Sequence, residues 1–441
     1  MRAIAFICLI TLGASVAGQD IAPVVAPENL LASQAEGLQL APLTGRVWNT
    51  RELLSLADAL PSAQANALRR LLQGRQAPPV HAFTGFAFAT AEDRLRLAGR
   101  VGGIFSLNAQ TDFVFSVDSV RALYEQRPIL PWAPILQLRL YTALGEWRIG
   151  QAPIRWGGGY SGALLLSDNA PPLLHVNYRK QWYLGKRLGT WHFEQMASLF
   201  DEDGSRRYVM ARRLYRDLSP RWEIAFAEAF KASKLPDGLL ASVVPFYLYQ
   251  LVYTWWRYDN NDEWFNYLAS VQTRYRFRNQ QVYLELLLDD LQAPRWLTRF
   301  RYTTPRKSGV LVGYHLPLSR TARLTVETAH TDGEGGGTYN FKSPQNRWRY
   351  RDAILGHPVG TNRDMLWIRL ESAVGKQGYL AVEHVNTRMA NASPDVPVSK
   401  EWTVYLYWRY AERYVAGIRW QNSRTRDDQQ TRWLVQAGCL F

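Results

Sequence analysis

The chain ends in the stretch Thr431-Arg-Trp-Leu-Val-Gln-Ala-Gly-Cys-Leu-Phe441, which alternates between two rows of side chains. One row is apolar and runs from Trp433 to Phe441, whereas the other begins at Arg432 and includes polar residues. Alternation with a period of two predicts a β-strand whose faces meet different surroundings. A terminal strand of this kind fits the closing strand of an outer-membrane β-barrel, in which no strand edge is left unpaired. The edge strand of a soluble β-sandwich is the alternative.

The same alternation recurs along the chain from Ala82 onward. Apolar residues alternate with charged or polar residues in the segments 94–101, 136–141, 267–278, 282–289 and 401–409. A row of charged side chains cannot be buried unpaired in a soluble core, whereas it can face the wet lumen of a barrel. The sequence therefore predicts an all-β transmembrane barrel of about eighteen antiparallel strands over residues 80–441.

Counted back from Phe441, the segments between the predicted strands are alternately long and short. The long ones are 422–429, 388–399, 331–362, 291–306 and 257–263, and the short ones lie near 411–413, 375–377, 317–319 and 279–280. Outer-membrane barrels have long external loops and short periplasmic turns, so we expect 331–362 to face outside. Towards the N-terminus the alternation is lost at the uncharged stretch 239–256, which we interpret as a broken strand or a segment folded into the lumen.

The first residues predict a secretory signal peptide over residues 1–18. Arg2 supplies the positive end, residues 3–12 the apolar run and Ser15-Val16-Ala17 a cleavage site, and the run is too short to span a bilayer. Residues 19–79 predict a small α-helical cap and a linker: Asn49 and Glu52 resemble a capping pair. A second helix would follow Pro61. We expect this helical bundle to lie at the periplasmic mouth of the barrel.

Composition limits the possible partners and cofactors. The mean hydropathy of −0.26 excludes a polytopic helical membrane protein. The 17 Trp and 23 Tyr suit either the aromatic girdles of a barrel or the stacking of sugar rings. The net charge of +14, mostly Arg, fits a polyanionic partner other than nucleic acid, or Arg residues that pair with lumenal Asp and Glu. Removal of the signal peptide leaves Cys439 as the single cysteine, so we predict no disulfide.

No motif for catalysis or metal binding is present. The seven histidines lack the spacing of metal ligands, so we predict no metal and no other cofactor. The sequence has no nucleophile elbow, and we predict that the protein is not an enzyme. A barrel hydrolase with a Ser/His pair on adjacent strands, at His192 or His315, remains a minor alternative.

The stretch from Arg155 to Pro172, RWGGGYSGALLLSDNAPP, is too elaborate for a plain turn. Its glycines allow tight turns and close backbone approach, and Leu164–Leu166 could seat against the barrel wall. Ser167 and Asp168, with the adjacent Asn169, can bond their own backbone. We interpret the stretch as an inward-folded constriction or plug, with direct contact of Trp156 or Tyr160 with a polysaccharide as the alternative.

This stretch resembles the Wzi-type family of capsule-assembly outer-membrane lectins. The family pattern is met by Trp156, Gly157, Gly159, Gly162, Leu165, Leu166, Ser167, Asn169, Ala170 and Pro172. The stretch from Tyr350 to Asp364 also looks like a loop of that family. The resemblance implies a barrel of about eighteen strands with a periplasmic helical bundle. Such a protein would bind capsular polysaccharide at the surface of a Gram-negative bacterium and aid capsule attachment without catalysis.

Two predicted outer loops combine Arg with aromatic residues, and we take them as candidate contacts with an acidic capsular or exopolysaccharide. The candidates are Arg295, Trp296 and Arg299 in one loop and Arg347, Trp348, Arg349 and Tyr350 in the other. A cation beside a ring could grip a sugar acid, although these rings could equally belong to the outer aromatic girdle. Besides this ligand we expect outer-membrane lipid as a partner and a monomeric protein. The alternative function is a porin-like channel for anionic solutes or oligosaccharides, lined by rows such as Arg274 and Arg276.

Overall fold

The computed structural model describes residues 80–440 except for 92–93, 109–110, 119–134, 153, 169, 186–188, 220, 234–264, 278–279, 290–306, 320–321, 333–336, 341–346, 351–352, 375–377, 391–398, 411–413 and 426–428. The predicted signal peptide, the helical cap, the stretch 239–256 and the loop 291–306 therefore lie outside the described residues.

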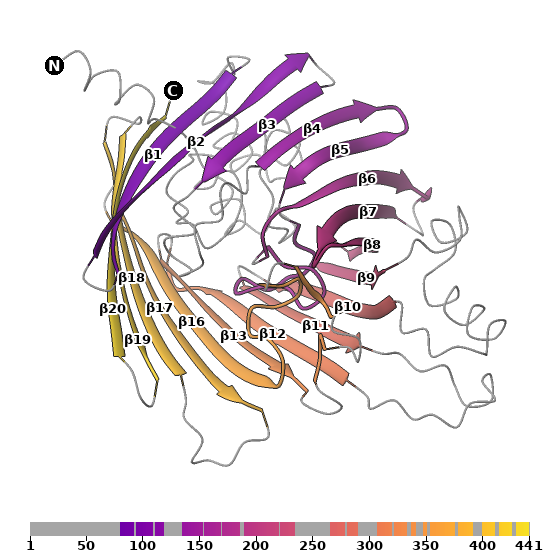
Figure 1. Cartoon of the computed structure of the whole chain (residues 1–441). Helices are drawn as coiled ribbons and strands as arrows, with labels where there is room; N and C mark the ends of the chain where they lie inside the picture. Colours follow the sequence, from indigo (N-terminus) through magenta and orange to yellow (C-terminus); the bar gives the residue numbers. More distant parts are fainter. Residues whose placement is uncertain are drawn as a thin grey trace.

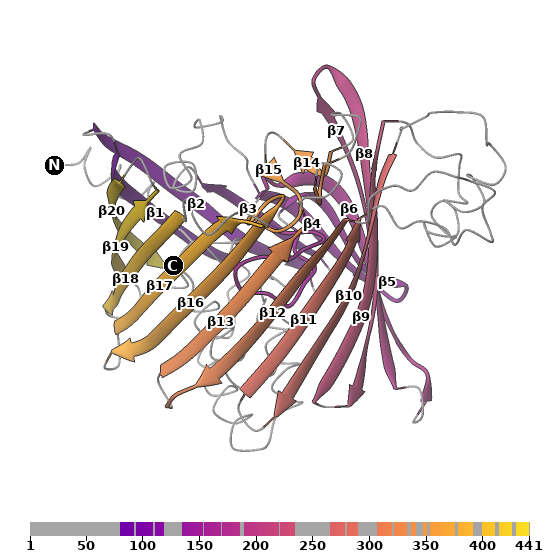
Figure 2. The ribbon, with the colours of Figure 1, turned by 90° about the horizontal axis from the view of Figure 1, so that it is seen from below.

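Twenty strands are described, and they carry the labels of Figures 1 and 2. In chain order they are β1 (Val80–Ala91), β2 (Arg94–Asn108), β3 (Thr111–Asp118), β4 (Ile135–Thr142), β5 (Gly145–Ala152), β6 (Leu173–Tyr183), β7 (Thr190–Glu202), β8 (Ser205–Ser219), β9 (Trp222–Ala232), β10 (Phe265–Phe277), β11 (Gln280–Asp289), β12 (Lys307–Pro317), β13 (Ala322–Thr331), β14 (Arg349–Tyr350), β15 (Ala353–Ile354), β16 (Arg363–Val374), β17 (Gly378–Met389), β18 (Ser399–Tyr410), β19 (Tyr414–Arg424) and β20 (Gln429–Leu440).

Eighteen of these strands form one antiparallel sheet, and β14 and β15 form a separate two-stranded sheet. Each strand of the large sheet pairs with its neighbours in chain order, with β13 next to β16. The first and last strands also pair, with Phe83 opposite Leu440, so the order of neighbours returns to its start (Figure 1). The predicted all-β antiparallel architecture is confirmed.

The two faces of the sheet differ as the alternation predicts. On β10, the apolar and aromatic side chains of Val271 and Tyr275 are 41% and 45% exposed, while those of Gln272 and Arg274 are buried inside the ring of strands. An apolar outer row and a polar inner row are what a strand needs between lipid and a lumen. No helix among the described residues is long and apolar enough to cross a membrane.

Long and short connections lie at opposite ends of the sheet. The connections β16–β17 and β18–β19 are short, at 375–377 and 411–413, as predicted. The connections β5–β6, β9–β10, β11–β12 and β13–β16 are long and share the other end, called here the long-loop end. At this end β7 and β8 meet in a tight turn at Asp203 and Gly204, and their hairpin projects beyond its neighbours (Figure 2). The predicted alternation is confirmed from β9 onward, whereas in the first half of the chain β1–β2 and β7–β8 are joined at the long-loop end by short turns.

Candidate functional site

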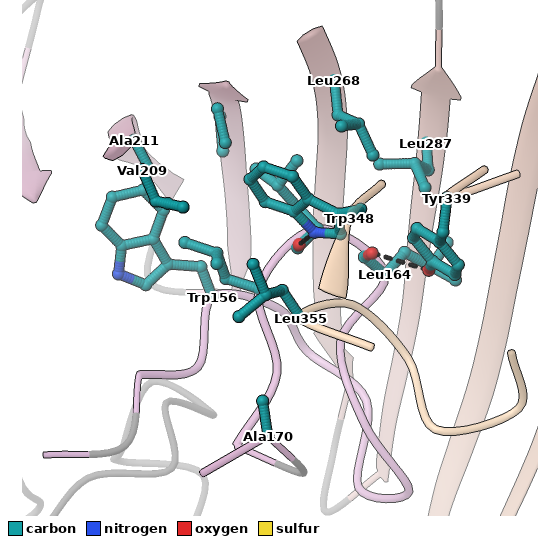
Figure 3. Close-up of a cluster of buried hydrophobic side chains, with 14 of the residues drawn as sticks. Trp156, Leu164, Ala170, Val209, Ala211, Leu268, Leu287, Tyr339, Trp348 and Leu355 are labelled. Carbon is teal, nitrogen blue, oxygen red and sulfur yellow. Dashed lines mark hydrogen bonds between the residues drawn. The ribbon is translucent and has the colours of Figure 1, made fainter. Parts of the chain in front are cut away.

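Two loops fold into the interior of the ring and meet there (Figure 1). They comprise the described residues of 154–172, between β5 and β6, and of 337–362, between β13 and β16, and together they are called the plug. Their contact is a cluster of buried side chains that includes Trp156, Leu164, Tyr339, Trp348 and Leu355 (Figure 3). The segment Arg155–Pro172 folds inward, and its partner overlaps the second segment that resembles the family.

The first plug segment closes on itself around its glycines. The backbone N–H of Trp156 donates to Leu166 O at 2.9 Å, and that of Ala163 donates to Ser167 Oγ at 3.3 Å. A methyl group on Gly157 would lie 2.5 Å from Ala163 Cβ, and one on Gly162 would lie 2.5 Å from Pro358 Cδ in the second segment. Glycine is required at these positions because neighbouring side chains already occupy the space that a Cβ atom would need.

Hydrogen bonds to backbone groups hold the two plug segments together. Trp348 Nε1 donates to Leu165 O, and the Tyr339 hydroxyl donates to Leu164 O, both at 2.7 Å (the latter dashed in Figure 3). The backbone N–H of Ser167 donates to Leu355 O, also at 2.7 Å. The apolar run Leu164–Leu166 therefore has its carbonyl groups satisfied although it is fully buried, as a stable buried loop requires.

Two carboxylates on the barrel wall receive the plug backbone. Glu327 on β13 accepts the backbone N–H groups of Tyr160 and Ser161, the latter at 2.6 Å. Glu285 on β11 accepts the N–H of Leu165 at 3.2 Å. These lumenal carboxylates supply acceptors for N–H groups that no regular structure satisfies. The plug is therefore tied to the wall as well as packed against it.

The wall is shaped to receive Trp156. Small side chains occupy the inward positions of β8 and β9, at Val209, Ala211, Ala227 and Ala229, and all are fully buried. Trp156 lies beside Val209 and Ala211 (Figure 3). Gln272 on β10 completes the contact by donating to Trp156 O at 3.1 Å. The tryptophan at the start of the motif thus anchors the plug, and its ring is not available to a sugar.

The remaining motif residues have structural roles where they are described. Asp168 pairs with Arg155 at 3.4 Å within the plug, and both side chains are buried. Pro172 O accepts a hydrogen bond from Gln151 Nε2 at 3.1 Å, which fixes the exit into β6. A methyl group on Gly159 would lie 2.4 Å from Gly162 O and 2.8 Å from Leu311 Cδ1, so this position has no room for a side chain either. Asn169 lies outside the described residues.

The candidate polysaccharide contacts are divided by the structure. Trp348 is fully buried, and Tyr350 packs edge-on against Phe200 with ring centroids 4.7 Å apart. Arg347 and Arg349 alternate with these rings and are partly exposed. The expected pairing of a cation with an exposed ring is therefore not found at 347–350, because the alternation buries the rings in the plug while Arg347 and Arg349 stay partly exposed. Arg295, Trp296 and Arg299 lie outside the described residues.

His357 and Ser161 form a Ser/His pair that the sequence did not indicate. His357 Nε2 lies 3.1 Å from Ser161 Oγ, and the backbone N–H of Val359 donates to His357 Nδ1 at 3.1 Å. Burial, together with Arg155, lowers the pKa of His357 to about 3, so its ring is neutral. Because Nδ1 accepts a hydrogen bond, the ring proton is on Nε2 and is donated to Ser161. This histidine therefore does not act as a base towards the serine, as nucleophilic catalysis would require.

The two histidines of the hydrolase alternative have other contacts. His192 stacks on Tyr215 with ring centroids 4.4 Å apart, and His315 stacks on Tyr160 while its Nδ1 lies 2.8 Å from Thr325 Oγ1. Among the described residues, no group of three or more His, Cys, Asp or Glu side chains is arranged to hold a metal ion.

Inward arginines are largely compensated by carboxylates. The ion pairs on the inner face include Arg148–Glu146, Arg213–Glu223, Arg274–Glu223, Arg323–Glu371 and Arg369–Glu383. This agrees with the interpretation that lumenal Arg pairs with Asp and Glu. The inner wall therefore has less free positive charge than the formal charge of +14 suggests.

The residues that sequence reasoning missed are Tyr339, His357, Glu285 and Glu327. Glu285 and Glu327 belong to inward rows of their strands. Their charge in such a row was the only indication in the sequence that they take part in lumenal contacts. That signal cannot tell a plug contact from an ion pair with a neighbouring strand. Tyr339 and His357 lie in a loop whose path the periodicity does not define.

Comparison with known proteins identifies the family. The family model described as capsule assembly protein Wzi matches residues 141–432, more than half of the chain. The chain belongs to this family. It is similar in structure to the Wzi outer-membrane protein of Escherichia coli, which is involved in group 1 capsule assembly and is described as a carbohydrate-binding β-barrel. The TM-score is 0.60 at 12% identity, over 90% of this chain and 89% of that one.

Other barrels are less similar. OccK3 and OccK11 of Pseudomonas aeruginosa give TM-scores of 0.47 and 0.46 at 9% and 10% identity. Each comparison covers 82% of this chain, with 96% of OccK3 and 95% of OccK11. No curated protein gives a significant sequence match. Membership of the Wzi family, the shared fold and the apolar outer face identify the chain as an outer-membrane β-barrel.

Proposed function

We propose that this member of the Wzi family is a non-enzymatic lectin in the outer membrane of a Gram-negative bacterium. It binds an acidic capsular or exopolysaccharide at the cell surface and aids capsule attachment and assembly. Family membership and a fold shared with a carbohydrate-binding barrel support this function. The long-loop end is the external end, because outer-membrane barrels place long loops outside and short turns in the periplasm.

The observation that carries the proposal is the arrangement of the β14–β15 hairpin. Figure 2 shows this hairpin at the end where β7 and β8 project. The rings of Trp348 and Tyr350 are buried, and Lys231 Nζ donates to Arg349 O at 2.7 Å. These contacts with the barrel wall and the plug hold the backbone of the hairpin in place. Arg347 and Arg349 are carried on this rigid support; both side chains are partly exposed, and the Nε atom of each is buried without a hydrogen-bond partner among the described residues. Guanidinium groups held in this way suit the bidentate binding of sugar carboxylates.

The interior supports a lectin over a porin-like channel. The plug is anchored by Glu285 and Glu327, and many of the inward arginines are engaged in ion pairs. A channel for anions needs an open lumen and uncompensated positive charge. The plug and the ion pairs reduce both. A channel would give a steady open conductance in a planar bilayer, whereas we expect the plugged protein to be closed.

The Ser161–His357 pair supports the absence of catalysis. The ring proton of His357 points at the serine, and Nδ1 receives a backbone N–H rather than a carboxylate. An activated serine needs a base with a free nitrogen and an orienting group behind it. We therefore assign this pair a structural role within the plug.

The test is capsule retention by cells that lack the native protein and express variants. Replacing Arg347 and Arg349 by Gln should lower retention of an acidic polysaccharide at least about tenfold, as expected for two lost charge-assisted contacts. The control is Arg206→Gln on the β7–β8 hairpin, an exposed arginine at the same end of the barrel. A carboxyl-reduced polysaccharide should bind weakly to the parent protein. Unchanged retention by the double variant would exclude the hairpin as the binding site.

A further inference from the structure

The outer face of β17, β18, β19 and β20 carries an aromatic belt near the long-loop end. Trp402 on β18 and Trp433 on β20 are 46% and 49% exposed. Trp420 on β19 lies beside Trp433 with ring centroids 6.4 Å apart, and His384 on β17 stacks on Trp402 at 4.2 Å. Aromatic side chains at such positions mark the boundary between the lipid chains and the headgroups. The belt therefore locates the external membrane surface on this wall.

Basic side chains lie on the same face, one step beyond the belt. Lys400 shares the outward row of β18 with Trp402, and Arg424 shares the outward row of β19 with Trp420. The strand register places Lys400 directly opposite Arg424, and both side chains are exposed. On β17, the exposed Arg388 follows the outward row of His384 and pairs with Asp364 at 2.9 Å.

The Lys400–Arg424 pair is unfavourable for the protein alone. Like charges directly opposite each other on neighbouring strands repel and lower the stability of a sheet. Within the described part of the chain, no carboxylate pairs with either residue, and the adjacent Glu401 belongs to the inward row. Two cations held opposite each other on a lipid-facing wall form a site that a nearby anion stabilises by offsetting their repulsion.

We propose that Lys400 and Arg424, with Arg388 beside them, bind a phosphate group of an outer-leaflet glycolipid. The position of the cations carries this assignment: they lie just beyond an aromatic belt, on the face that contacts lipid, where headgroup phosphates lie. A phosphate carries up to two negative charges and several acceptor oxygens, which match an ammonium and a guanidinium. The site is separate from the β14–β15 hairpin, so its ligand does not compete with the polysaccharide.

The test uses the full-length protein in detergent and two forms of one glycolipid, bis-phosphorylated lipid A and lipid A with both phosphates removed. The parent protein should bind the phosphorylated form at least tenfold more tightly. The double variant Lys400→Gln and Arg424→Gln should lose roughly 10- to 30-fold in that affinity, and the difference should shrink in about 1 M salt. The control is Lys180→Gln on β6, where Lys180 lies towards the short-turn end. It removes one lysine charge at the other membrane boundary and should leave the affinity unchanged.

Several results would overturn the assignment. Equal binding of both lipid A forms, or an unchanged affinity in the double variant, would exclude a phosphate site. Equally tight binding of inorganic phosphate would show that no glycolipid is recognised. If the double variant lost binding to an acidic polysaccharide while it kept lipid A, these cations would belong to the polysaccharide site instead. Because both side chains are exposed, the variants should fold, and heat-modifiable migration on gels checks this directly.

Discussion

Tyr283 on β11 occupies the space that a side chain at Gly313 on β12 would need. The two residues are opposite each other in the strand register, and a methyl group on Gly313 would lie 2.0 Å from the Tyr283 ring. Glu327 on β13 is opposite Gly313 from the other side. Tyr283 therefore reaches across the glycine and donates its hydroxyl to Glu327, the carboxylate that receives the plug backbone. One glycine on the wall thus permits the contact that orients a plug anchor.

Gly313→Ala should displace Tyr283 and weaken the hold of Glu327 on the plug. We expect a loss of about 1–3 kcal/mol in stability, the usual cost of overpacking, measured by thermal unfolding in detergent. Gly158→Ala is the matched control, because its methyl group would lie 3.4 Å from Tyr283 Cβ, an ordinary contact. Equal stability of the two variants would argue against the role assigned to Gly313.

Glu327→Gln should loosen the plug while the barrel stays folded. An amide supplies one acceptor oxygen and presents donors to at least one of the N–H groups of Tyr160 and Ser161. Loss of this buried acceptor should cost about 1–3 kcal/mol. In planar bilayers we expect intermittent openings that the parent protein lacks. Glu371→Gln, which affects an ion pair with Arg323 on the wall, is the control and should remain closed.

Trp348→Ala should affect the plug first and sugar binding only as a consequence. The ring is fully buried and donates to Leu165 O, so its removal leaves a cavity and an unpaired carbonyl, at a cost of about 3–5 kcal/mol. Proteolysis of the plug should increase before any capsule is lost. Trp348→Phe fills part of the cavity and should give a smaller effect. A loss of capsule binding with unchanged protease resistance would contradict this role.

The stability of the plug should fall in acid because of His357. Its pKa is about 3 in the folded protein, below the ordinary value of 6.5, because burial disfavours the charged ring. A lowered folded-state pKa means that the unfolded chain binds the proton first. The contribution of the neutral His357 ring to the stability of the plug is complete above pH 6.5, and it is lost progressively as the pH falls towards 3.

The stability lost through protonation of His357 is at most on the order of 5 kcal/mol. Local opening of the plug would reduce this loss. Protease sensitivity of the plug measured from pH 7 to pH 4 should rise for the parent protein. His357→Gln should be less stable at neutral pH but should respond less to pH in this range. An identical pH response in this variant would assign the acid sensitivity to other groups.

Much of the architecture could be predicted from the pattern of residues. Alternation of apolar and charged residues defined the strands and their faces, because a strand between lipid and water has no other stable arrangement of side chains. The turns at 375–377 and 411–413 were located in the same way. The glycines of Arg155–Pro172 indicated an inward-folded segment, because so many close backbone approaches are unnecessary in an exposed loop.

The tertiary structure alone decided what each loop residue does. In the strands, the side-chain direction follows from position, so Val271 and Gln272 could be assigned to opposite faces in advance. In the loops there is no such period, and Trp348 was therefore grouped with exposed cations although it is buried. The partners of the plug backbone, Glu285 and Glu327, lie more than a hundred residues away in the chain. The local sequence determined the barrel, whereas only long-range packing decided that two distant loops meet inside it.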